Sequence, residues 1–284
     1  MNPRKTLLRK VGRAIADFRM IREGDRIAVG VSGGKDSLAL ADALKELCRR
    51  SPVHFSLEAF TVEQGKFVGP LDHLADVFGK RGIRWTYYVD RASLQLLEDQ
   101  PGHGCDTCSR FRRRAVYDVA ARLGCNVVAL GHTADDLCEA LLRNSLFTGR
   151  LSALPAVTWS RSGEFRLIRP LVYVPETVTE AYAEAAGLPV TPCVCSDRAG
   201  TVREKLRAFL ADLRGHNPHV LQNLLAAMGR IDTDRLLDRR FVDTSWEGGA
   251  RPEPDSELYP VDGIVAVSKS PKGAPDRALP DHGG

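Results

Sequence analysis

Short apolar runs alternate with amphipathic stretches through the first half of the chain. The run 26–31 is mostly apolar and ends in a glycine-rich turn, which is typical of a strand buried in a parallel sheet. Residues 36–49 then carry leucines at helical spacing. The same alternation recurs and predicts strands at 54–61, 83–89 and 126–131, and helices at 69–81, about 108–123 and 135–147.

This alternation predicts the class of fold. Helices of such length between strands imply right-handed crossovers, which make the strands parallel and cover both faces of the sheet. We therefore expect a doubly wound α/β fold, with its site at the carboxyl ends of the strands. Beyond residue 149 the pattern is less regular and predicts a helix at 176–187 and two more within 203–229.

The pattern also suggests how the chain is divided. Residues 1–22 are expected to form a basic amphipathic helix, residues 23–230 the main domain with C-terminal helices, and residues 245–284, where proline recurs, a disordered tail. No apolar run approaches the ~20 residues that span a bilayer, and the N-terminus lacks an export signal. We therefore expect a cytoplasmic protein with no membrane partner.

Charge adds a second feature, because basic residues crowd two of the predicted helices. The net charge is only +4, with 43% hydrophobic and 27% charged residues, as in an ordinary globular protein. Such clusters can lie against phosphates, but a solvated helix face explains them equally well, so charge permits a nucleic-acid partner without demonstrating one. The clustered residues are Arg4, Lys5, Arg9, Lys10 and Arg13, and Arg110, Arg112, Arg113 and Arg114.

The turn after the first strand has the chemistry of a phosphate site. Its two glycines allow a tight turn with exposed N–H groups, and the helix N-terminus that follows favours an anion. The lysine can neutralise phosphate charge, and the serine hydroxyls can donate hydrogen bonds. The aspartate fits poorly beside bare phosphate unless a divalent cation lies between them, which predicts Mg²⁺. The residues of this turn are Ser32, Gly33, Gly34, Lys35, Asp36 and Ser37.

The spacing of this turn excludes a Walker A loop. That loop needs four residues between its first glycine and the Gly-Lys pair, whereas Gly30 and Gly34 are separated by three and an aspartate follows the lysine. The hexapeptide resembles instead the SGGxDS loop of the PP-loop ATPases, which grips the pyrophosphate of ATP and releases AMP. We therefore expect an ATP site here.

A second polar turn follows the strand at 126–131. It carries His132, Asp135 and Asp136, and it is expected at the same edge of the sheet. One aspartate can cap the following helix, since Asp at that place accepts hydrogen bonds from free N–H groups. A histidine with two aspartates after a parallel strand nevertheless favours side chains directed toward the nucleotide.

The chain has seven cysteines and no export signal, which favours metal or catalytic thiols over disulfides. Cys105 and Cys108 open a predicted helix, and Cys193 and Cys195 form a second close pair. Together they offer three or four soft ligands, which suit zinc or an iron–sulfur cluster, and the spacing does not distinguish the two. The other three are expected to be small buried residues: Cys48, Cys125 and Cys138.

Across residues 6–230 the chain resembles the tRNA 2-thiocytidine biosynthesis proteins, a branch of the PP-loop superfamily. The order and separation of several segments carry this resemblance. These segments are 11–18, Ser32–Ser37, 105–113 (CDTCSRFRR), 129–136 (ALGHTADD), 168–171 and 191–195.

The resemblance implies an ATP-dependent tRNA sulfurtransferase. In the family, ATP and Mg²⁺ adenylate the C2 carbonyl of an anticodon-loop cytidine, pyrophosphate leaves, and sulfur displaces AMP to give 2-thiocytidine. A [4Fe-4S] cluster on three cysteines carries the incoming sulfur, and by position its ligands would be Cys105, Cys108 and Cys195, with Cys193 as the alternative. The implied partners are tRNA, a sulfur donor such as a cysteine desulfurase, and a second copy of the chain, since dimers are common in the family.

Three departures from the family pattern concern the substrate more than ATP use. The late pair is Cys193-Val194-Cys195 rather than Cys-x-x-Cys, Thr133 replaces the family's second histidine, and the stretch after Cys195 differs. Two other functions therefore stay open. One is a PP-loop sulfurtransferase for another tRNA base or a small molecule. The other is a non-catalytic nucleotide- or RNA-binding protein with a structural zinc.

Overall fold

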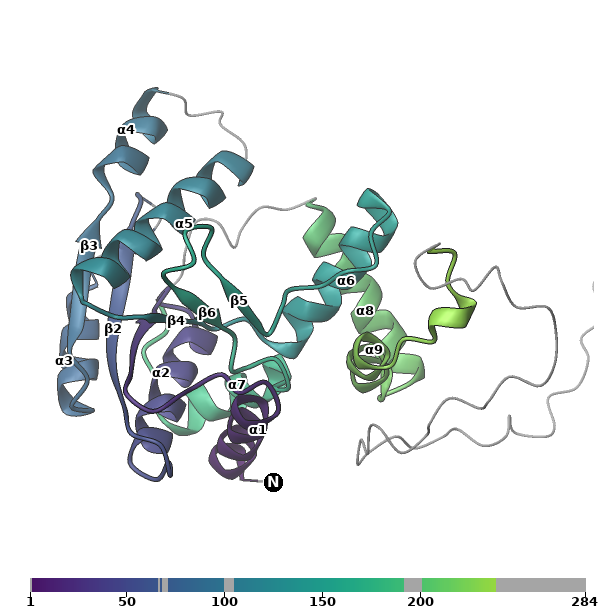
Figure 1. The fold of residues 1–284 in the computed structure, drawn as a ribbon, viewed down its shortest axis with the longest axis horizontal. Coiled ribbons are helices and arrows are strands. Elements are labelled where there is room, and N and C mark those ends of the chain that lie inside the picture. The colour runs from purple at the N-terminus through teal and green to yellow at the C-terminus, as the bar shows by residue number, and fades with distance from the viewer. Residues whose placement is uncertain (1, 66, 68–70, 100–104, 192–200, 239–284) are drawn as a thin grey trace, which may run out of the picture. The chain divides into compact units, whose positions relative to one another are not determined.

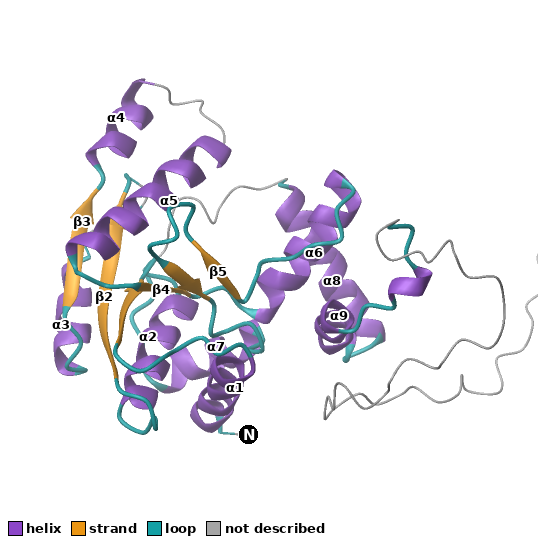
Figure 2. Ribbon diagram, viewed as in Figure 1, coloured by secondary structure: helices purple, strands orange, loops and turns teal. Residues whose placement is uncertain are grey.

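In the computed structural model, which describes residues 2–65, 67, 71–99, 105–191 and 201–238, the strands form one six-stranded sheet. The order is β3-β2-β1-β4-β6-β5 (Figures 1 and 2). All neighbours are parallel except β5, which pairs antiparallel with β6 at one edge. The strands are β1 (Asp25–Gly30), β2 (Phe55–Glu63), β3 (Trp85–Val89), β4 (Val127–Leu130), β5 (Val157–Trp159) and β6 (Arg166–Ile168).

The helices and the sheet belong to the first of two compact units, Met1–Met228 and Gly229–Gly284. In the second unit the described residues include a 3₁₀ turn at Thr233–Arg235. No helix of the described chain is long and apolar enough to cross a membrane. The helices are α1 (Pro3–Asp17), α2 (Lys35–Cys48), α3 (Asp72–Lys80), α4 (Arg91–Asp99), α5 (Cys105–Arg122), α6 (Ala134–Thr148), α7 (Glu176–Ala185), α8 (Val202–His216) and α9 (Val220–Gly229).

Side chains alternate between the two faces of β1, so each face has its own core. Ile27 and Val29 are fully buried in a cluster that also contains residues of α1, α2, α3 and α7. Ala28 packs on the other face with Val119 and Ala120 of α5, which Figure 1 shows lying along the sheet. A third cluster joins α6 to α8 and α9.

The order of the strands creates a switch point between β1 and β4. From β1 the chain builds outward through β2 to β3, and it then returns to the other side of β1 to build β4. The segments that leave the carboxyl ends of these two neighbouring strands, β1 and β4, therefore meet at the switch point. In open α/β sheets ligands bind at this point.

The predicted fold class, a doubly wound parallel sheet, is confirmed. The sequence pattern missed α4 and the hairpin of β5 and β6. Both strands of the hairpin have only three residues, too few for a pattern of alternation to be recognised. Within residues 1–22, where a basic helix was expected, α1 spans Pro3–Asp17, begins after an Asn2 cap and buries Leu7, Val11 and Ala14.

A buried ion pair joins three strands at the amino edge of the sheet. Arg166 of β6 binds Asp25 of β1, and both side chains are 4% exposed. Asn126, just before β4, donates a hydrogen bond of 2.9 Å to the same carboxylate, and the backbone N–H of Arg22 donates another of 2.6 Å. The carboxylate is thus fully partnered, as a buried charge must be to avoid a large desolvation cost.

Arg166→Met is expected to lower the free energy of unfolding by about 3–5 kcal/mol, because it leaves the Asp25 carboxylate buried without its cation. Urea unfolding would measure the change. Arg50→Met is the matched control, since its pair with Glu46 leaves the arginine 62% exposed and surface pairs contribute about 0–1 kcal/mol. Equal losses in the two variants would contradict a structural role for the buried pair.

Candidate active site

Two turns meet at the switch point with their backbones in contact. Gly30 and Leu130 are paired in register, so the loop after β1 and the turn after β4 leave the sheet at the same level. A Cβ atom added to Gly131 would lie 3.1 Å from the backbone N and Cα atoms of Ser37. Glycine at residue 131 therefore allows this close approach, because a side chain would force the backbone at Ser37 to shift.

The loop after β1 holds its shape through glycine and serine. Gly33 has a φ of +77°, a left-handed conformation that favours glycine. The Ser37 hydroxyl donates a 2.9 Å hydrogen bond to the Gly34 carbonyl and accepts one of 3.1 Å from the Ser32 N–H. Gly34 is the N-cap of α2 and makes no side-chain cap bond. The Ser37 hydroxyl, which the sequence predicted as a phosphate donor, thus closes the loop on itself.

Lys35 lies among carboxylates. Its Nζ atom is 2.5 Å from Glu176 Oε1 and 3.6 Å from both Asp36 Oδ2 and Glu180 Oε1. Burial by itself would lower the pKa of Lys35, but the hydrogen bond to Glu176 and the neighbouring negative charges raise the pKa above its ordinary value. The lysine is therefore cationic at neutral pH, as a phosphate-binding role requires.

Asp36 faces α7 from the first turn of α2. The Thr179 hydroxyl donates a hydrogen bond to its carboxylate. Burial raises the pKa of Asp36, against the opposing effects of Thr179 and Lys35, while Glu176 and Asp136 raise it further. A carboxylate in this position gains from any additional cation, because a positive charge would favour its ionised form.

The turn after β4 brings its acidic residues to the same place. Thr133 caps α6, and its side chain and that of Asp136 form a reciprocal capping box. Asp135 is buried, accepts a 2.7 Å hydrogen bond from the Glu176 N–H, and pairs with Arg214. One aspartate was expected to cap this helix, and Asp136 does so by accepting from the Thr133 N–H. Thr133 itself is a residue type that is preferred at the N-cap.

His132 is neutral at neutral pH. Burial and the neighbouring Arg169 lower the pKa of His132 to about 4. Its Nδ1 atom accepts a 3.3 Å hydrogen bond from Arg169 Nε. A neutral imidazole contributes no positive charge toward a phosphate, so a role for His132 at the nucleotide would depend on hydrogen bonding or contact.

A group of charged residues that was not predicted from the sequence lies around the two turns. Glu139 of α6 is 5% exposed and binds both Arg203 and Arg207. Arg203 also binds Asp136, and the Nη2 atom of Arg207 lies 3.7 Å from Glu176 Oε2. Ion pairs therefore run from α8 through Glu176 to Lys35. The spacing of Arg203, Arg207 and Arg214 on one helical face was a signal that could have pointed to this surface.

The early cysteine pair lies in the first turn of α5. The C-terminus of this helix is at the amino edge of the sheet, where Arg26 Nη2 donates a 2.9 Å hydrogen bond to the Leu123 carbonyl. With its 18 residues, α5 extends about 27 Å toward the carboxyl edge. Cys105 and Cys108 thus begin the helix on the side of the site, although their side chains, like residues Cys193 and Cys195, lie outside what the structure describes.

The other cysteines fit the sequence expectation in part. Cys125 and Cys138 are buried, and burial raises the pKa of their thiols to about 11 and about 12, so they stay protonated. Cys48 is half-buried. Within the part of the chain that the structure describes, no three His, Cys, Asp or Glu side chains gather closely enough to hold a metal ion.

Comparison with known proteins agrees with this architecture. Residues 3–211 match the family model of the PP-loop domain. A tRNA-cytidine(32) 2-sulfurtransferase of Sorangium cellulosum is 39% identical over 279 residues, which cover 93% of this chain and 99% of that protein. One from Syntrophotalea carbinolica is also 39% identical and covers 84% of this chain and 95% of its own.

A solved structure shares the fold. The U34-tRNA thiolase NcsA from Methanococcus maripaludis, determined with its [4Fe-4S] cluster, superposes with a TM-score of 0.63. The match covers 80% of this chain and 77% of NcsA at 22% identity. At that identity the likeness concerns the fold.

Proposed function

The chain belongs to the PP-loop family, among the tRNA-cytidine(32) 2-sulfurtransferases, and we propose that it uses ATP to replace the C2 oxygen of an anticodon-loop cytidine in tRNA with sulfur. The observation that carries the proposal is the contact between the two turns at the switch point. Glu176 supports the proposal further, because its side chain binds Lys35 and its backbone N–H donates a hydrogen bond to Asp135, so the two turns share one neighbour.

ATP is the first substrate, and the loop after β1 is its proposed phosphate site. The backbone of Ser32–Ser37 and the cationic Lys35 would bind the pyrophosphate portion, which leaves the α-phosphorus facing the incoming nucleoside. Lys35 would exchange its contact with Glu176 for phosphate oxygens. Since the described carboxylates form no metal site by themselves, Mg²⁺ would be held by Asp36 and ATP together, with Asp135 and Asp136 nearby. The ion would supply charge neutralisation on the phosphates.

The chemistry requires two displacements. In the first, the C2 oxygen of cytidine attacks the α-phosphorus of ATP, a P–O bond forms, and the bond to pyrophosphate breaks. In the second, a sulfide-level sulfur from a donor attacks C2, the C2–O bond breaks with its electron pair on AMP, and the sulfur loses its proton to give C2=S. Adenylation is needed because a carbonyl oxygen is otherwise a poor leaving group.

The cysteines fit a soft metal centre, and we assign them to a [4Fe-4S] cluster. Cys105 and Cys108 share one turn of α5, and Cys195 would supply the third thiolate, with Cys193 as the alternative. Three thiolates on a four-iron cluster leave one iron open, and when bound the cluster supplies that iron as the carrier of the incoming sulfur. A cysteine desulfurase is the proposed source of the sulfur, which it carries as a persulfide, so a thiol reductant must supply the two electrons that release this sulfur at the sulfide level. A homodimer is the proposed assembly.

Anaerobic purification followed by iron, sulfide and zinc analysis tests the cluster. About four irons per chain are expected, whereas stoichiometric zinc in a colourless protein would contradict the cluster assignment.

Incubation with ATP, tRNA and a sulfide source, followed by nucleoside analysis, tests the reaction. We expect 2-thiocytidine together with AMP and pyrophosphate. A different thiolated base would move the function to another sulfurtransferase, and absence of pyrophosphate would exclude the mechanism.

A further inference from the structure

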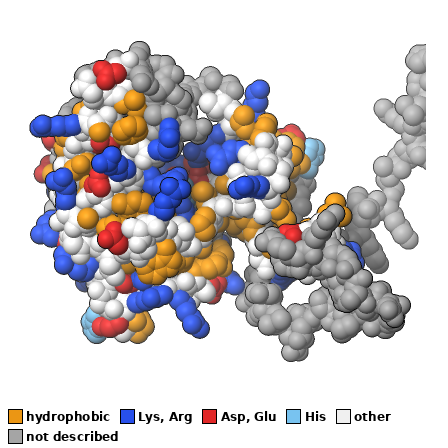
Figure 3. Space-filling view, turned by 45° about the horizontal axis from the view of Figure 1, so that its top comes forward, with side chains coloured by type: hydrophobic (Ala, Val, Ile, Leu, Met, Phe, Trp, Pro, Cys, Tyr) orange, Lys and Arg blue, Asp and Glu red, His pale blue; other side chains and the backbone are white. Residues whose placement is uncertain are grey.

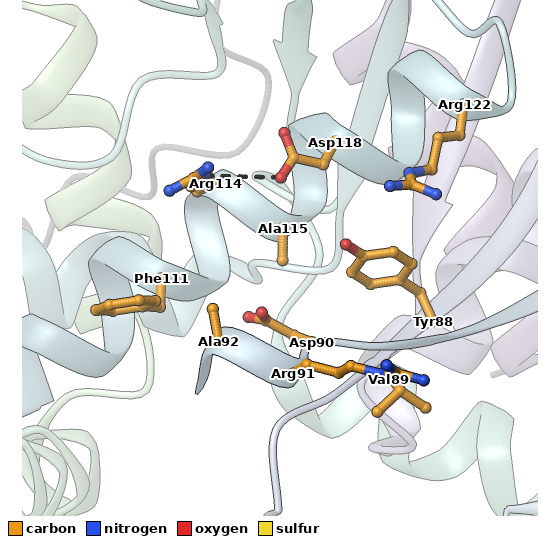
Figure 4. Close-up of a pocket in the computed structure, with 10 residues that line it drawn as sticks. All are labelled: Tyr88, Val89, Asp90, Arg91, Ala92, Phe111, Arg114, Ala115, Asp118 and Arg122. Atoms are coloured by element: carbon orange, nitrogen blue, oxygen red, sulfur yellow. Dashed lines mark ion pairs between the residues drawn. The ribbon is translucent and has the colours of Figure 1, made fainter. Parts of the chain in front are cut away.

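A cavity lies away from the two turns of the candidate active site. Its volume is about 450 Å³, and it opens between the end of β3, the start of α4 and one stripe of α5 (Figure 4). This volume is within the range of roughly 300–1,000 Å³ that is usual for sites of small ligands. The residues that α5 contributes are spaced so that they lie on one face of the helix, at positions 111, 114, 115, 118 and 122.

The cavity is open because its middle is lined by alanine. Ala92 of α4 and Ala115 of α5 have no atoms beyond Cβ, and Figure 4 shows Phe111 and Tyr88 at opposite ends of the space between them. Ala115 is 3% exposed, whereas Ala92 is exposed at the rim. A flat group could therefore lie against Phe111 without moving the backbone.

The polar groups of the cavity fall into two kinds. Arg122 lies 5.5 Å from the centre of the Tyr88 ring, and Arg114 forms an exposed ion pair of 3.8 Å with Asp118. These arginines keep their charge near solvent, where they can bind an anion. The Asp90 carboxylate is buried and accepts hydrogen bonds from Gln64 and Ser93, so its charge is largely shielded from an occupant.

Aromatic faces beside guanidinium groups are the chemistry by which proteins bind unpaired nucleotides. Bases stack on aromatic rings or on arginine, and the phosphate takes the positive charge. Lys and Arg side chains are also more widespread than Asp and Glu on the face drawn in Figure 3. A purely apolar ligand would offer no negative charge to the three arginines of the cavity, Arg91, Arg114 and Arg122.

The position of the cavity relates it to the cysteines. At a rise of about 1.5 Å per residue, Phe111 lies only ~4.5 Å along the axis of α5 from Cys108. The cavity therefore starts within one turn of the early cysteine pair, on the helix that leads to it.

We propose that this cavity binds an unpaired nucleotide of the RNA substrate, one that neighbours the cytidine to be modified. The base lies against Phe111 at one end of the cavity, and its phosphate lies toward Arg122, beside Tyr88 at the other end. The assignment rests on the proposed function, because it takes the RNA loop as the ligand, and it adds a site that selects single-stranded over paired RNA.

Binding of a fluorescently labelled RNA stem-loop with the sequence of an anticodon arm tests the assignment. Phe111→Ala is expected to raise the Kd roughly 5- to 150-fold, the loss that one base stack predicts. Arg122→Ala, which removes the proposed phosphate contact, should also raise the Kd and should reduce its dependence on salt. Ala92→Trp fills the cavity from its exposed rim and should weaken binding similarly without removing any contact of the fold. Arg84→Ala is the matched control, because it removes the same charge just before β3, at the opposite end of the strand. It should change the Kd by less than a factor of about three.

The outcomes separate the two proposals. Unchanged affinity in Arg122→Ala and Ala92→Trp, with a wild-type protein that binds the stem-loop, would overturn the cavity assignment alone. Equal weakening toward a fully paired duplex would also overturn it, since the site would then not select unpaired nucleotides. A wild-type protein that binds no stem-loop would instead count against the proposed function. If Phe111→Ala fails to fold, Ala92→Trp still decides the question.

Discussion

Asp36→Asn is expected to reduce ATP-dependent pyrophosphate release by roughly a thousandfold or more. The variant keeps an oxygen for the Thr179 hydroxyl but loses the charge that we assign to Mg²⁺, and metal-assisted charge stabilisation is worth several kcal/mol in the transition state. Release of pyrophosphate with tRNA present measures the effect. Thermal unfolding should change little, because the neutral side chain removes a buried charge.

The acid limb of the pH profile gives a second readout of Asp36. Its pKa is raised by burial, so the carboxylate is protonated at a higher pH than an exposed aspartate would be. The kcat/KM for ATP, which reports the enzyme before Mg²⁺ and ATP bind, should therefore fall as the pH decreases through that raised pKa, and this limb should be absent in Asp36→Asn. Asp76→Asn, on the exposed side of α3, is the control and should keep wild-type release. Unchanged release in Asp36→Asn would remove Asp36 from the mechanism.

Cys108→Ala is expected to abolish sulfur insertion while pyrophosphate release continues. The substitution removes one of three proposed thiolates, and a cluster with two protein ligands is not retained, so iron and thiolated nucleoside should both fall to background. Iron analysis and nucleoside analysis of the same preparation measure the two effects. Adenylation should persist because the loop Ser32–Ser37 is built without the cysteines.

Cys48→Ala is the control for this prediction. Cys48 is half-buried at the end of α2 and donates a 3.0 Å hydrogen bond to the Phe55 carbonyl near the amino edge of the sheet. This variant should retain iron and thiolation. Thiolation that survives in Cys108→Ala would refute the cluster assignment, and loss of iron in both variants would show that the measurement reports folding.

The sequence predicted the parts of the site that depend on local backbone chemistry. Ser32–Ser37 combines an apolar run, a glycine pair and a helix start, and each of these has a signature within a few residues. The sheet followed from the same local signals, since strands alternating with helices leave few topologies. The short strands β5 and β6 were not predicted, because three residues are too few to show a period.

The rest of the site depends on contacts between distant segments. Glu176 reaches Lys35 across 141 positions in the chain, and Arg203 reaches Asp136 across 67. The arginines of α8 recur on one helical face, but no local pattern identifies their partners or distinguishes Glu176 from other glutamates on a helix surface. The double use of Asp136, as a cap for α6 and as a partner of Arg203, has the same origin.

The contact between Gly131 and Ser37 has a consequence for protein design. Because the backbones of the two turns touch, the loop after β1 is not a module that transfers alone into another α/β scaffold. A host should also carry glycine directly after the neighbouring strand, in a register that matches Gly30 and Leu130. A graft of the hexapeptide alone would place the host's Cβ atom about 3.1 Å from the loop backbone, and the two turns would have to shift apart to accommodate it.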